Sequence, residues 1–163
     1  MISIDESVLR DQVAELIVIR ASGHLYDHQR QYPKWELPNN ELKRLLSKGV
    51  GGVIIYGGSA QDVLVRTQEL SLWANKPLLL CADIEEGLGQ RFDGGTWLLP
   101  PMAVAHIYKQ DPRKGLSIAK NYGQCIASQA KSSGINWVLG PVCDVNTNSL
   151  NPVINMRAWG EDP

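Results

Sequence analysis

The sequence has no excess of charge, because 16 lysine and arginine residues balance 17 aspartate and glutamate residues and the net charge is −1. Proteins that bind nucleic acid or acidic lipids usually carry a basic surface. We therefore expect neither nucleic acid nor a membrane as the partner. Histidine is also scarce. His24 and His28 flank Asp27, but no third ligand is evident, so the sequence predicts no metal site and no cofactor.

Long apolar stretches and a disulfide framework are missing as well. No apolar run approaches the roughly 18 residues that a membrane-spanning helix needs. Residues 1–6 are acidic and have neither the basic region nor the apolar stretch of a secretory signal. Three cysteines are an odd number, and two of them lie in or beside apolar runs. These features predict reduced thiols and a cytoplasmic location.

What the sequence does contain is four short, continuous apolar runs, at 16–19, 53–56, 78–82 and 137–139. Such runs are typical of strands buried on both faces of a parallel sheet. The segments between them have helical apolar spacing, which predicts an α/β fold with strands and helices in alternation.

Three helices are predicted from their start and stop signals. The first carries a leucine stripe, with Asn39 as its cap and Gly49 at its end. The second begins at a capping-box spacing of Ser59 and Asp62. The third begins at Asp111-Pro112 and ends at Gly134.

Two architectures fit four strand–helix units. One is the first half of an eight-stranded (β/α)8 barrel, a fold of about 250 residues. The other is a complete small doubly wound sheet. The last residues, Asp162-Pro163, repeat the Asp-Pro signal that begins a helix at Asp111-Pro112. We therefore expect a barrel that is incomplete in this chain.

The candidate site residues follow the strands, because ligands bind at the carboxyl ends of parallel strands in both architectures. Asp83 follows the third apolar run, which predicts a half-buried carboxylate that needs donors. Arg91 is one candidate donor and a substrate hydroxyl is another, although an Asp–Arg pair can also be purely structural. No helix is signalled between Asp83 and about Gln110, and a loop of that length is usually functional. Asp144 follows the fourth run.

A different site is suggested by Gly57-Gly58-Ser59, which lies between a strand and a helix start. Backbone N–H groups in such a turn can bind phosphate. The full glycine–lysine fingerprint is absent, and a tight strand-to-helix turn explains the glycines equally. A phosphate- or nucleotide-binding domain therefore stays open as an alternative function.

Taken in order, the strand exits resemble glycoside hydrolase family 3. The resemblance rests on segments 51–58, 82–91, 98–100, 140–146 and 157–163. It is to the amino-terminal catalytic barrel of that family, which includes β-glucosidases and β-N-acetylhexosaminidases. One departure is that Glu86 replaces the first glycine of the usual Asp-x-Glu-Gly-Gly pattern.

The resemblance implies a retaining β-glycosidase acting on a β-linked sugar. It places Asp83, Arg91 and Arg157 around the sugar whose bond is cut, and Asp144 beneath Arg157 or against the sugar. Tyr56, Trp97 and Trp159 become candidates for packing on the sugar's apolar face, with wall packing as the alternative. The family's nucleophile and acid/base match nothing in residues 1–163, so no catalytic residue is predicted here.

A barrel that is incomplete in this chain affects the expected activity and association. Alone, the chain is expected to be inactive and to associate through unpaired barrel edges or with a second half. A sugar-binding module without catalysis remains a further alternative.

Overall fold

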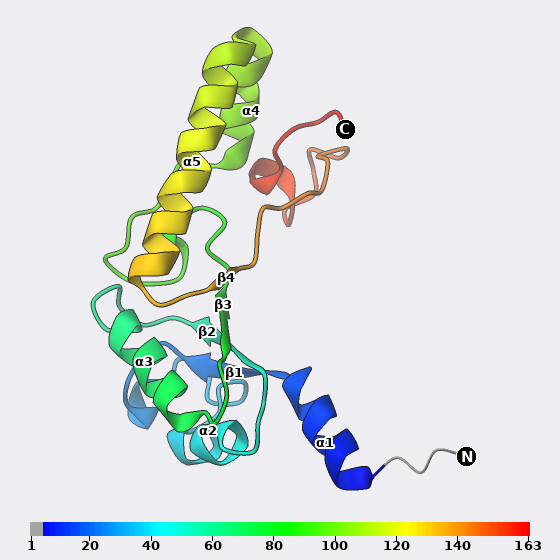
Figure 1. Ribbon diagram of the computed structural model, residues 1–163. Coiled ribbons are helices and arrows are strands. Elements are labelled where there is room, and N and C mark those ends of the chain that lie inside the picture. Colours follow the sequence, from blue (N-terminus) through cyan, green and yellow to red (C-terminus); the bar gives the residue numbers. More distant parts are fainter. Residues whose placement is uncertain (1–4) are drawn as a thin grey trace.

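A computed structural model describes residues 5–163 as a parallel β-sheet with helices at its side and at one end (Figure 1). The strands are β1 (Val18–Ser22), β2 (Gly52–Tyr56), β3 (Leu79–Ala82) and β4 (Trp137–Val138). The α-helices are α1 (Glu6–Glu15), α2 (Asn39–Leu46), α3 (Val63–Trp73), α4 (Pro101–Gln110) and α5 (Pro112–Ser132). Single 3-10 turns are η1 (Asp27–Gln29), η2 (Leu88–Gln90) and η3 (Asn155–Arg157).

The strand order is β1-β2-β3-β4 and every pairing is parallel. Sequential order with helical crossovers is the arrangement of a (β/α)8 barrel, whereas a doubly wound sheet reverses its order at a switch point. Within residues 5–163, β1 and β4 each pair on one side only. The sheet is therefore open, as expected of half a barrel.

The predicted helices form where their capping signals lie. The Asp111 side chain accepts from the Lys114 N–H at 3.1 Å and Pro112 occupies the first turn of α5. Gly134, just beyond the end of α5, adopts a φ of 75°, which suits glycine. Before α3, the Ser59 hydroxyl accepts from the Asp62 N–H at 3.1 Å and donates to its carboxylate at 2.8 Å. Asn39 is the first residue of α2 and not its cap.

Two helices were not predicted. Helix α1 begins after Asp5, whose carboxylate accepts from the Ser7 N–H at 2.8 Å. Helix α4 begins at Pro101, so the expectation of an unstructured stretch to Gln110 is wrong. Proline fits the first turn of a helix because its missing N–H has no partner there anyway.

The two faces of the sheet differ in their surroundings. On one side, Ala21, Val53 and Ile55 are fully buried, and they belong to one core with Leu42, Leu46, Val63 and Leu70 of α2 and α3. On the opposite side, Val18, Leu79 and Trp137 are 39%, 48% and 41% exposed. In a closed barrel that side faces the interior. The exposure of these side chains is therefore what an open half-barrel predicts.

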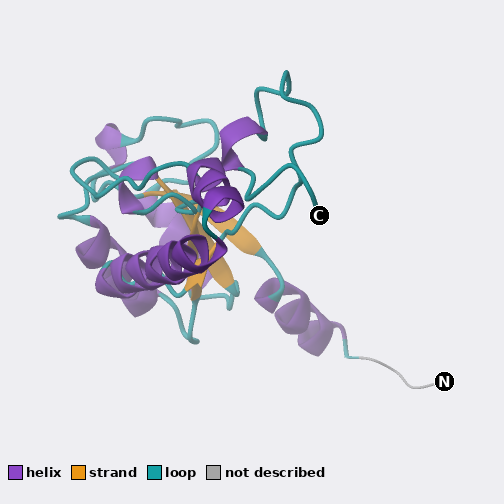
Figure 2. Cartoon of the chain, turned by 90° about the horizontal axis from the view of Figure 1, so that it is seen from above, coloured by secondary structure: helices purple, strands orange, loops and turns teal. Residues whose placement is uncertain are grey.

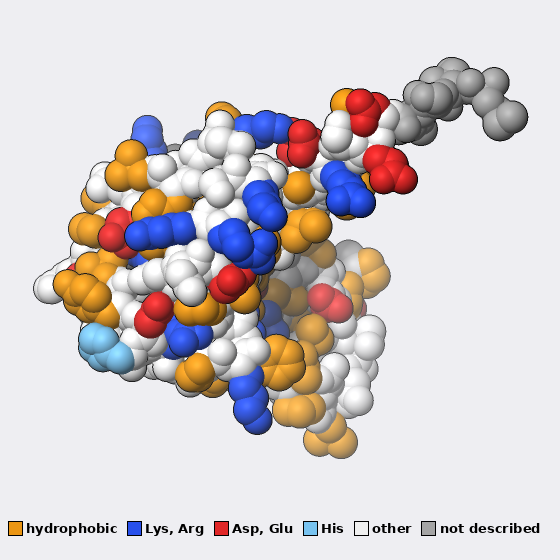
Figure 3. Space-filling view, turned by 90° about the horizontal axis from the view of Figure 1, so that it is seen from below, with side chains coloured by type: hydrophobic (Ala, Val, Ile, Leu, Met, Phe, Trp, Pro, Cys, Tyr) orange, Lys and Arg blue, Asp and Glu red, His pale blue; other side chains and the backbone are white. Residues whose placement is uncertain are grey.

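The remaining surface is mixed. Helix α1 projects from the body without a buried residue, and α4 and α5 lie beside each other at the opposite end (Figures 1 and 2). From below, basic, acidic and apolar side chains are interspersed (Figure 3). Across residues 5–163, none of the helices combines the length and apolar character that crossing a bilayer requires.

Candidate functional site

Three side chains meet at the carboxyl ends of β2 and β3. Asp83 directly follows β3, and its Oδ2 accepts from the Tyr56 hydroxyl at 2.9 Å and from Arg91 Nη2 at 3.3 Å. The Asp83 side chain is 25% exposed and that of Arg91 is 33% exposed. The structure therefore brings Asp83 and Arg91 together, as predicted, and Tyr56 joins them.

Arg20 is a member of this cluster that sequence reasoning missed. Its guanidinium lies 3.9 Å from the centre of the Tyr56 ring, and Arg91 lies 5.6 Å from the same ring. Arg20 stands on β1, on the sheet face that also carries Ser22, which pairs with Tyr56. An arginine that interrupts an apolar strand was the available signal. Two cations beside a ring are favourable because the ring face is electron-rich.

The cluster is polar and is held together by charge-assisted bonds. Burial and the hydrogen bond to the Asp83 carboxylate raise the pKa of Tyr56 above its ordinary value. Within residues 5–163, the second oxygen of Asp83, Oδ1, has no hydrogen-bond partner. A carboxylate oriented in this way can accept hydrogen bonds from the hydroxyls of a ligand.

Arg157 pairs with Glu85 and not with Asp83. Arg157 Nε and Nη2 lie 3.0 and 2.8 Å from Glu85 Oε1. The Glu85 side chain is 1% exposed and the Arg157 side chain 40%. Because Glu85 is two residues beyond Asp83, this ion pair ties η3 to the same strand exit.

Glu86 is buried like its neighbour Glu85. Glu86 is 8% exposed, and its Oε2 accepts from Trp97 Nε1 at 2.7 Å. The next residue, Gly87, has a φ of 96° and lies under the backbone of Thr96. The departure from the family pattern at Glu86 is therefore accommodated by a specific side-chain bond.

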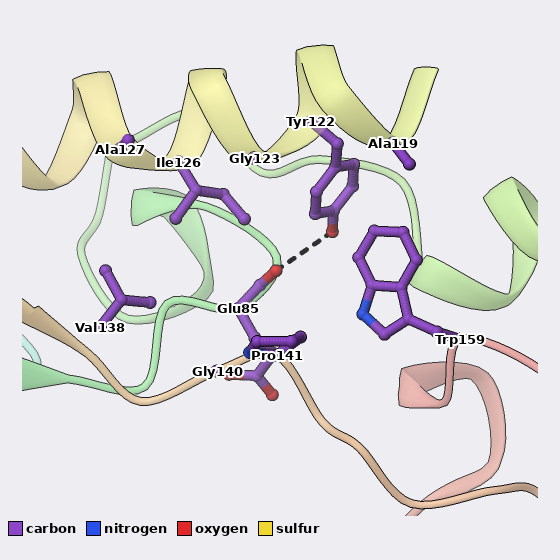
Figure 4. Close-up of a pocket in the computed structure, with 10 residues that line it drawn as sticks. All are labelled: Glu85, Ala119, Tyr122, Gly123, Ile126, Ala127, Val138, Gly140, Pro141 and Trp159. Atoms are coloured by element: carbon purple, nitrogen blue, oxygen red, sulfur yellow. Dashed lines mark hydrogen bonds between the residues drawn. The ribbon is translucent and has the colours of Figure 1, made fainter. Parts of the chain in front are cut away.

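Trp159 packs as part of a wall. Its ring meets that of Tyr122 edge to face, with centroids 5.2 Å apart. The two rings border a cavity of about 400 Å³ between α5 and the exit of β4 (Figure 4). The Tyr122 hydroxyl donates to the backbone oxygens of Glu85 at 3.2 Å and Leu99 at 3.1 Å. Of the two interpretations of Trp159, the structure favours wall packing.

Asp144 lies apart from the cluster. Its side chain is exposed and has no hydrogen bond or ion pair within residues 5–163. It borders a shallow cavity with Cys143, Trp159 and the last residues of the chain. The structure does not bring Asp144 to Arg157 or to Asp83.

The glycines at 57 and 58 have a packing explanation. Gly58 has a φ of 96°, and a Cβ there would lie 2.7 Å from the backbone of Gly23. The N–H groups of the following turn are occupied: Ala60 donates to Asp93 O at 2.9 Å and Val63 to Ser59 O at 3.0 Å. The N–H groups of Ala60 and Val63 are therefore not free to bind a phosphate.

The histidine pair forms no metal-binding cluster. His28 stacks on Tyr26 at 5.8 Å, and Asp27 accepts from the Asn39 N–H at 2.8 Å. Throughout the part of the chain that the structure describes, no three His, Cys, Asp or Glu residues are grouped as metal ligands.

Comparison with known proteins identifies relatives for most of the chain. A β-hexosaminidase of Stenotrophomonas maltophilia (strain R551-3) is 33% identical over 132 residues, which are 78% of this chain and 39% of the relative. A β-hexosaminidase of Thiobacillus denitrificans is 31% identical over 132 residues, 78% of this chain and 36% of the relative. The chain thus spans about two-fifths of the length of these relatives.

Solved structures share the fold. Beta-glucoside phosphorylase BglX bound to 2FGlc has a TM-score of 0.72 at 24% identity, over 99% of this chain and 26% of that one. Native NagZ from Neisseria gonorrhoeae has a TM-score of 0.70 at 24% identity, over 90% and 41%. The family model described as the glycosyl hydrolase family 3 N terminal domain matches residues 8–163. The chain therefore belongs to glycosyl hydrolase family 3, to which the resemblance of its strand exits had pointed.

Proposed function

We propose that this chain supplies part of the sugar-binding pocket of a retaining β-glycosidase that cleaves β-glucosides or β-N-acetylhexosaminides. The observation that carries the proposal is the Asp83 carboxylate, which Tyr56 and Arg91 hold through one oxygen while the other remains open to a ligand. Sugar hydroxyls have fixed directions, and a carboxylate beside a guanidinium fork matches them with strong bonds.

The roles of the predicted residues follow from this geometry. Asp83 accepts from sugar hydroxyls and Arg91 orients Asp83 and donates to the sugar. Arg157, held by Glu85, contributes its exposed N–H groups from the side of η3. Asp144 keeps its place as a candidate only at the periphery, because it contacts none of these side chains within residues 5–163.

Binding and catalysis are divided in this proposal. Retaining glycosidases use two carboxyl groups about 5 Å apart, one as nucleophile and one as acid/base. Asp83 is committed to Tyr56 and Arg91, and Glu85 is buried against Arg157. We assign both catalytic carboxyl groups to polypeptide outside residues 1–163, and these residues to the first four strand–helix units of the barrel.

The open sheet edges and the free cysteines bear on the association and the location of the chain. The open edges at β1 and β4 and the exposed Val18, Leu79 and Trp137 are surfaces that the remaining strands of a barrel would cover. We propose that the chain associates through these edges with the completing half. Free cysteines, one of them buried at Cys81, support a reducing, cytoplasmic location.

A thermal-shift comparison distinguishes sugar binding from phosphate binding. Methyl β-glucoside or methyl β-N-acetylglucosaminide should raise the melting temperature of the 163-residue chain, because a ligand of the native state stabilises it. Inorganic phosphate at the same concentration should leave the melting temperature unchanged. Stabilisation by phosphate and none by either glycoside would contradict the proposal and favour the site at Gly57-Gly58-Ser59.

A further inference from the structure

Arg20 lies between a loop and the cluster at the strand exits. Its backbone oxygen accepts from the Leu37 N–H at 3.1 Å, at the end of the segment 23–38 that connects β1 to α2. Its guanidinium lies 5.6 Å from the centre of the Tyr32 ring in that segment and 3.9 Å from the centre of the Tyr56 ring. The Arg20 side chain therefore joins this loop to the tyrosine of the cluster.

The loop itself is fixed by a buried carboxylate. Glu36 is 1% exposed, and its Oε2 accepts from the Tyr32 N–H at 3.0 Å. Arg30 Nη1 donates to the Glu36 backbone oxygen at 2.7 Å. Such a bond resists opening, because a buried carboxylate without a donor is costly. An ordered backbone therefore presents the Tyr32 ring to Arg20.

Aromatic rings, and not carboxylates, hold the Arg20 guanidinium. Among residues 5–163 no Asp or Glu forms an ion pair with it, and its Nε is buried without a hydrogen-bond partner. A cation is attracted to the electron-rich face of an aromatic ring, more strongly where it is shielded from water. The 3.9 Å contact therefore restrains the Tyr56 ring.

The Tyr56 hydroxyl in turn restrains Asp83. It donates to Asp83 Oδ2 at 2.9 Å, whereas Arg91 Nη2 lies 3.3 Å from the same oxygen. Because both donors use Oδ2, their positions determine where Oδ1 points. Burial raises the pKa of Tyr56 and the bond to Asp83 raises it further, whereas the positive charges of Arg20 and Arg91 lower it. Arg20 thus acts on the Tyr56 hydroxyl through its charge as well as through packing.

From these contacts we propose that Arg20 is a positioning residue, which holds the Tyr56 ring where its hydroxyl fixes the Asp83 carboxylate for the sugar. Arg20 acts through Tyr56 and does not touch the sugar. This inference rests on the proposed function and deepens it, because it makes sugar affinity depend on β1 and on the loop around Tyr32. If Arg20 only packs against the two rings, it contributes to stability and not to affinity.

A double-mutant cycle on sugar affinity tests the route through Tyr56. Methyl β-glucoside and methyl β-N-acetylglucosaminide are titrated calorimetrically into the chain, Arg20→Met, Tyr56→Phe and the double variant. Arg20→Met keeps an apolar stem without the charge and should weaken the glycoside that binds about fivefold, as expected for one hydrogen bond. Tyr56→Phe should weaken it similarly, and adding Arg20→Met should cause no further loss. Arg20→Lys should restore most of the affinity, because the cation over the ring is kept.

Lys43→Met is the matched control. Lys43 lies on α2, and its Nζ is 4.7 Å from the centre of the Trp73 ring. The variant therefore also removes a cation from an aromatic ring, and it should leave glycoside affinity unchanged. If Arg20→Met and Lys43→Met both lower the melting temperature while neither lowers affinity, Arg20 only packs and the inference is overturned.

A second cycle needs no sugar and so separates this inference from the proposed function. Urea-unfolding midpoints are compared for Arg20→Met, Asp83→Ala and the double variant. The midpoint shifts should be non-additive, because loss of either side chain already disturbs the bond between Tyr56 and Asp83. In a Tyr56→Phe background the ring remains and the hydroxyl is gone, so the coupling should disappear. A direct attraction between the charges of Arg20 and Asp83 would persist there.

The outcomes distinguish the two proposals. Additive midpoint shifts, coupling that persists in Tyr56→Phe, or an affinity loss from Arg20→Met that is as large in Tyr56→Phe would overturn the role of Arg20 and leave the sugar pocket standing. If neither glycoside binds, the proposed function fails and the role of Arg20 in sugar binding fails with it, whatever the unfolding cycle shows.

Discussion

The ion pair between Glu85 and Arg157 gives the sharpest test of how the site is built, because its two members are buried so differently. Glu85 has a 1% exposed side chain, whereas Arg157 is 40% exposed. Truncating the arginine leaves a carboxylate in the interior, and neutralising the glutamate leaves a cation that water can reach. The two changes should therefore have unequal costs.

The magnitudes follow from the contacts. In Arg157→Ala, Glu85 Oε1 loses both of its donors, and Oε2 is buried without a partner already. Removing one member of a buried pair costs about 3–5 kcal/mol. Because Arg157 is partly solvated, we expect about 3 kcal/mol, near the lower limit of that range. In Glu85→Gln an amide oxygen still accepts from Arg157, so the cost should be about 1 kcal/mol.

Urea unfolding followed by circular dichroism measures both free energies. Arg44→Ala is the control, because Arg44 forms a surface pair with Glu41 at 2.7 Å and both side chains are at least 40% exposed. It should cost no more than about 1 kcal/mol. Equal costs for Arg157→Ala and Arg44→Ala, or a larger cost for Glu85→Gln than for Arg157→Ala, would refute the reasoning.

Two other features give predictions that are independent of the ion pair. Gly58→Ala should lower the free energy of unfolding in urea by about 3 kcal/mol, because φ is 96° and the added Cβ would clash with the backbone of Gly23. Gly94 also has a positive φ but lies in open space, so Gly94→Ala should cost about 1 kcal/mol. Similar losses for both would contradict this explanation of Gly58. Iodoacetamide should label the exposed Cys143 in the native protein and spare Cys81, because burial raises the pKa of the Cys81 thiol to about 11. Peptide mass mapping measures the labelling, and a labelled Cys81 beside an unlabelled Cys143 would contradict the prediction. Because that pKa lies above the ordinary value of 9.0, the stability contributed by the neutral Cys81 thiol is complete below pH 9 and is lost as pH rises through 11. The free energy of unfolding should therefore fall less steeply with pH in Cys81→Ala than in the unaltered chain over this range.

The sequence predicted the sheet and the largest helix because their signals are local. Each of the four strands overlaps a predicted apolar run, and α5 begins at the predicted Asp111-Pro112 signal. The boundaries of an element differ from the predicted ones where two elements share one apolar run. The run at 16–19 joins the end of α1 to the start of β1, so the strand lies at Val18–Ser22.

The candidate site was predictable only in part. Asp83 and Arg91 are eight residues apart on one loop, so their pairing is a short-range arrangement that the sequence could indicate. Glu85 and Arg157 are 72 residues apart, and their pairing depends on how η3 folds back on the strand exit. The spacing of residues in the sequence does not predict that η3 folds back on the strand exit. The stacking of Arg20 on Tyr56 depends in the same way on the register between β1 and β2.

The central claim is that Asp83 holds a sugar, and Asp83→Asn tests it most directly. Isothermal titration with the glycoside that stabilises the chain should show affinity reduced about tenfold to a hundredfold, because charged hydrogen bonds contribute about 1.5–3 kcal/mol. The melting temperature without ligand should stay close to that of the unaltered chain. Asp93→Asn, at an exposed aspartate of the same loop, should bind normally. Unchanged affinity in Asp83→Asn would contradict the account.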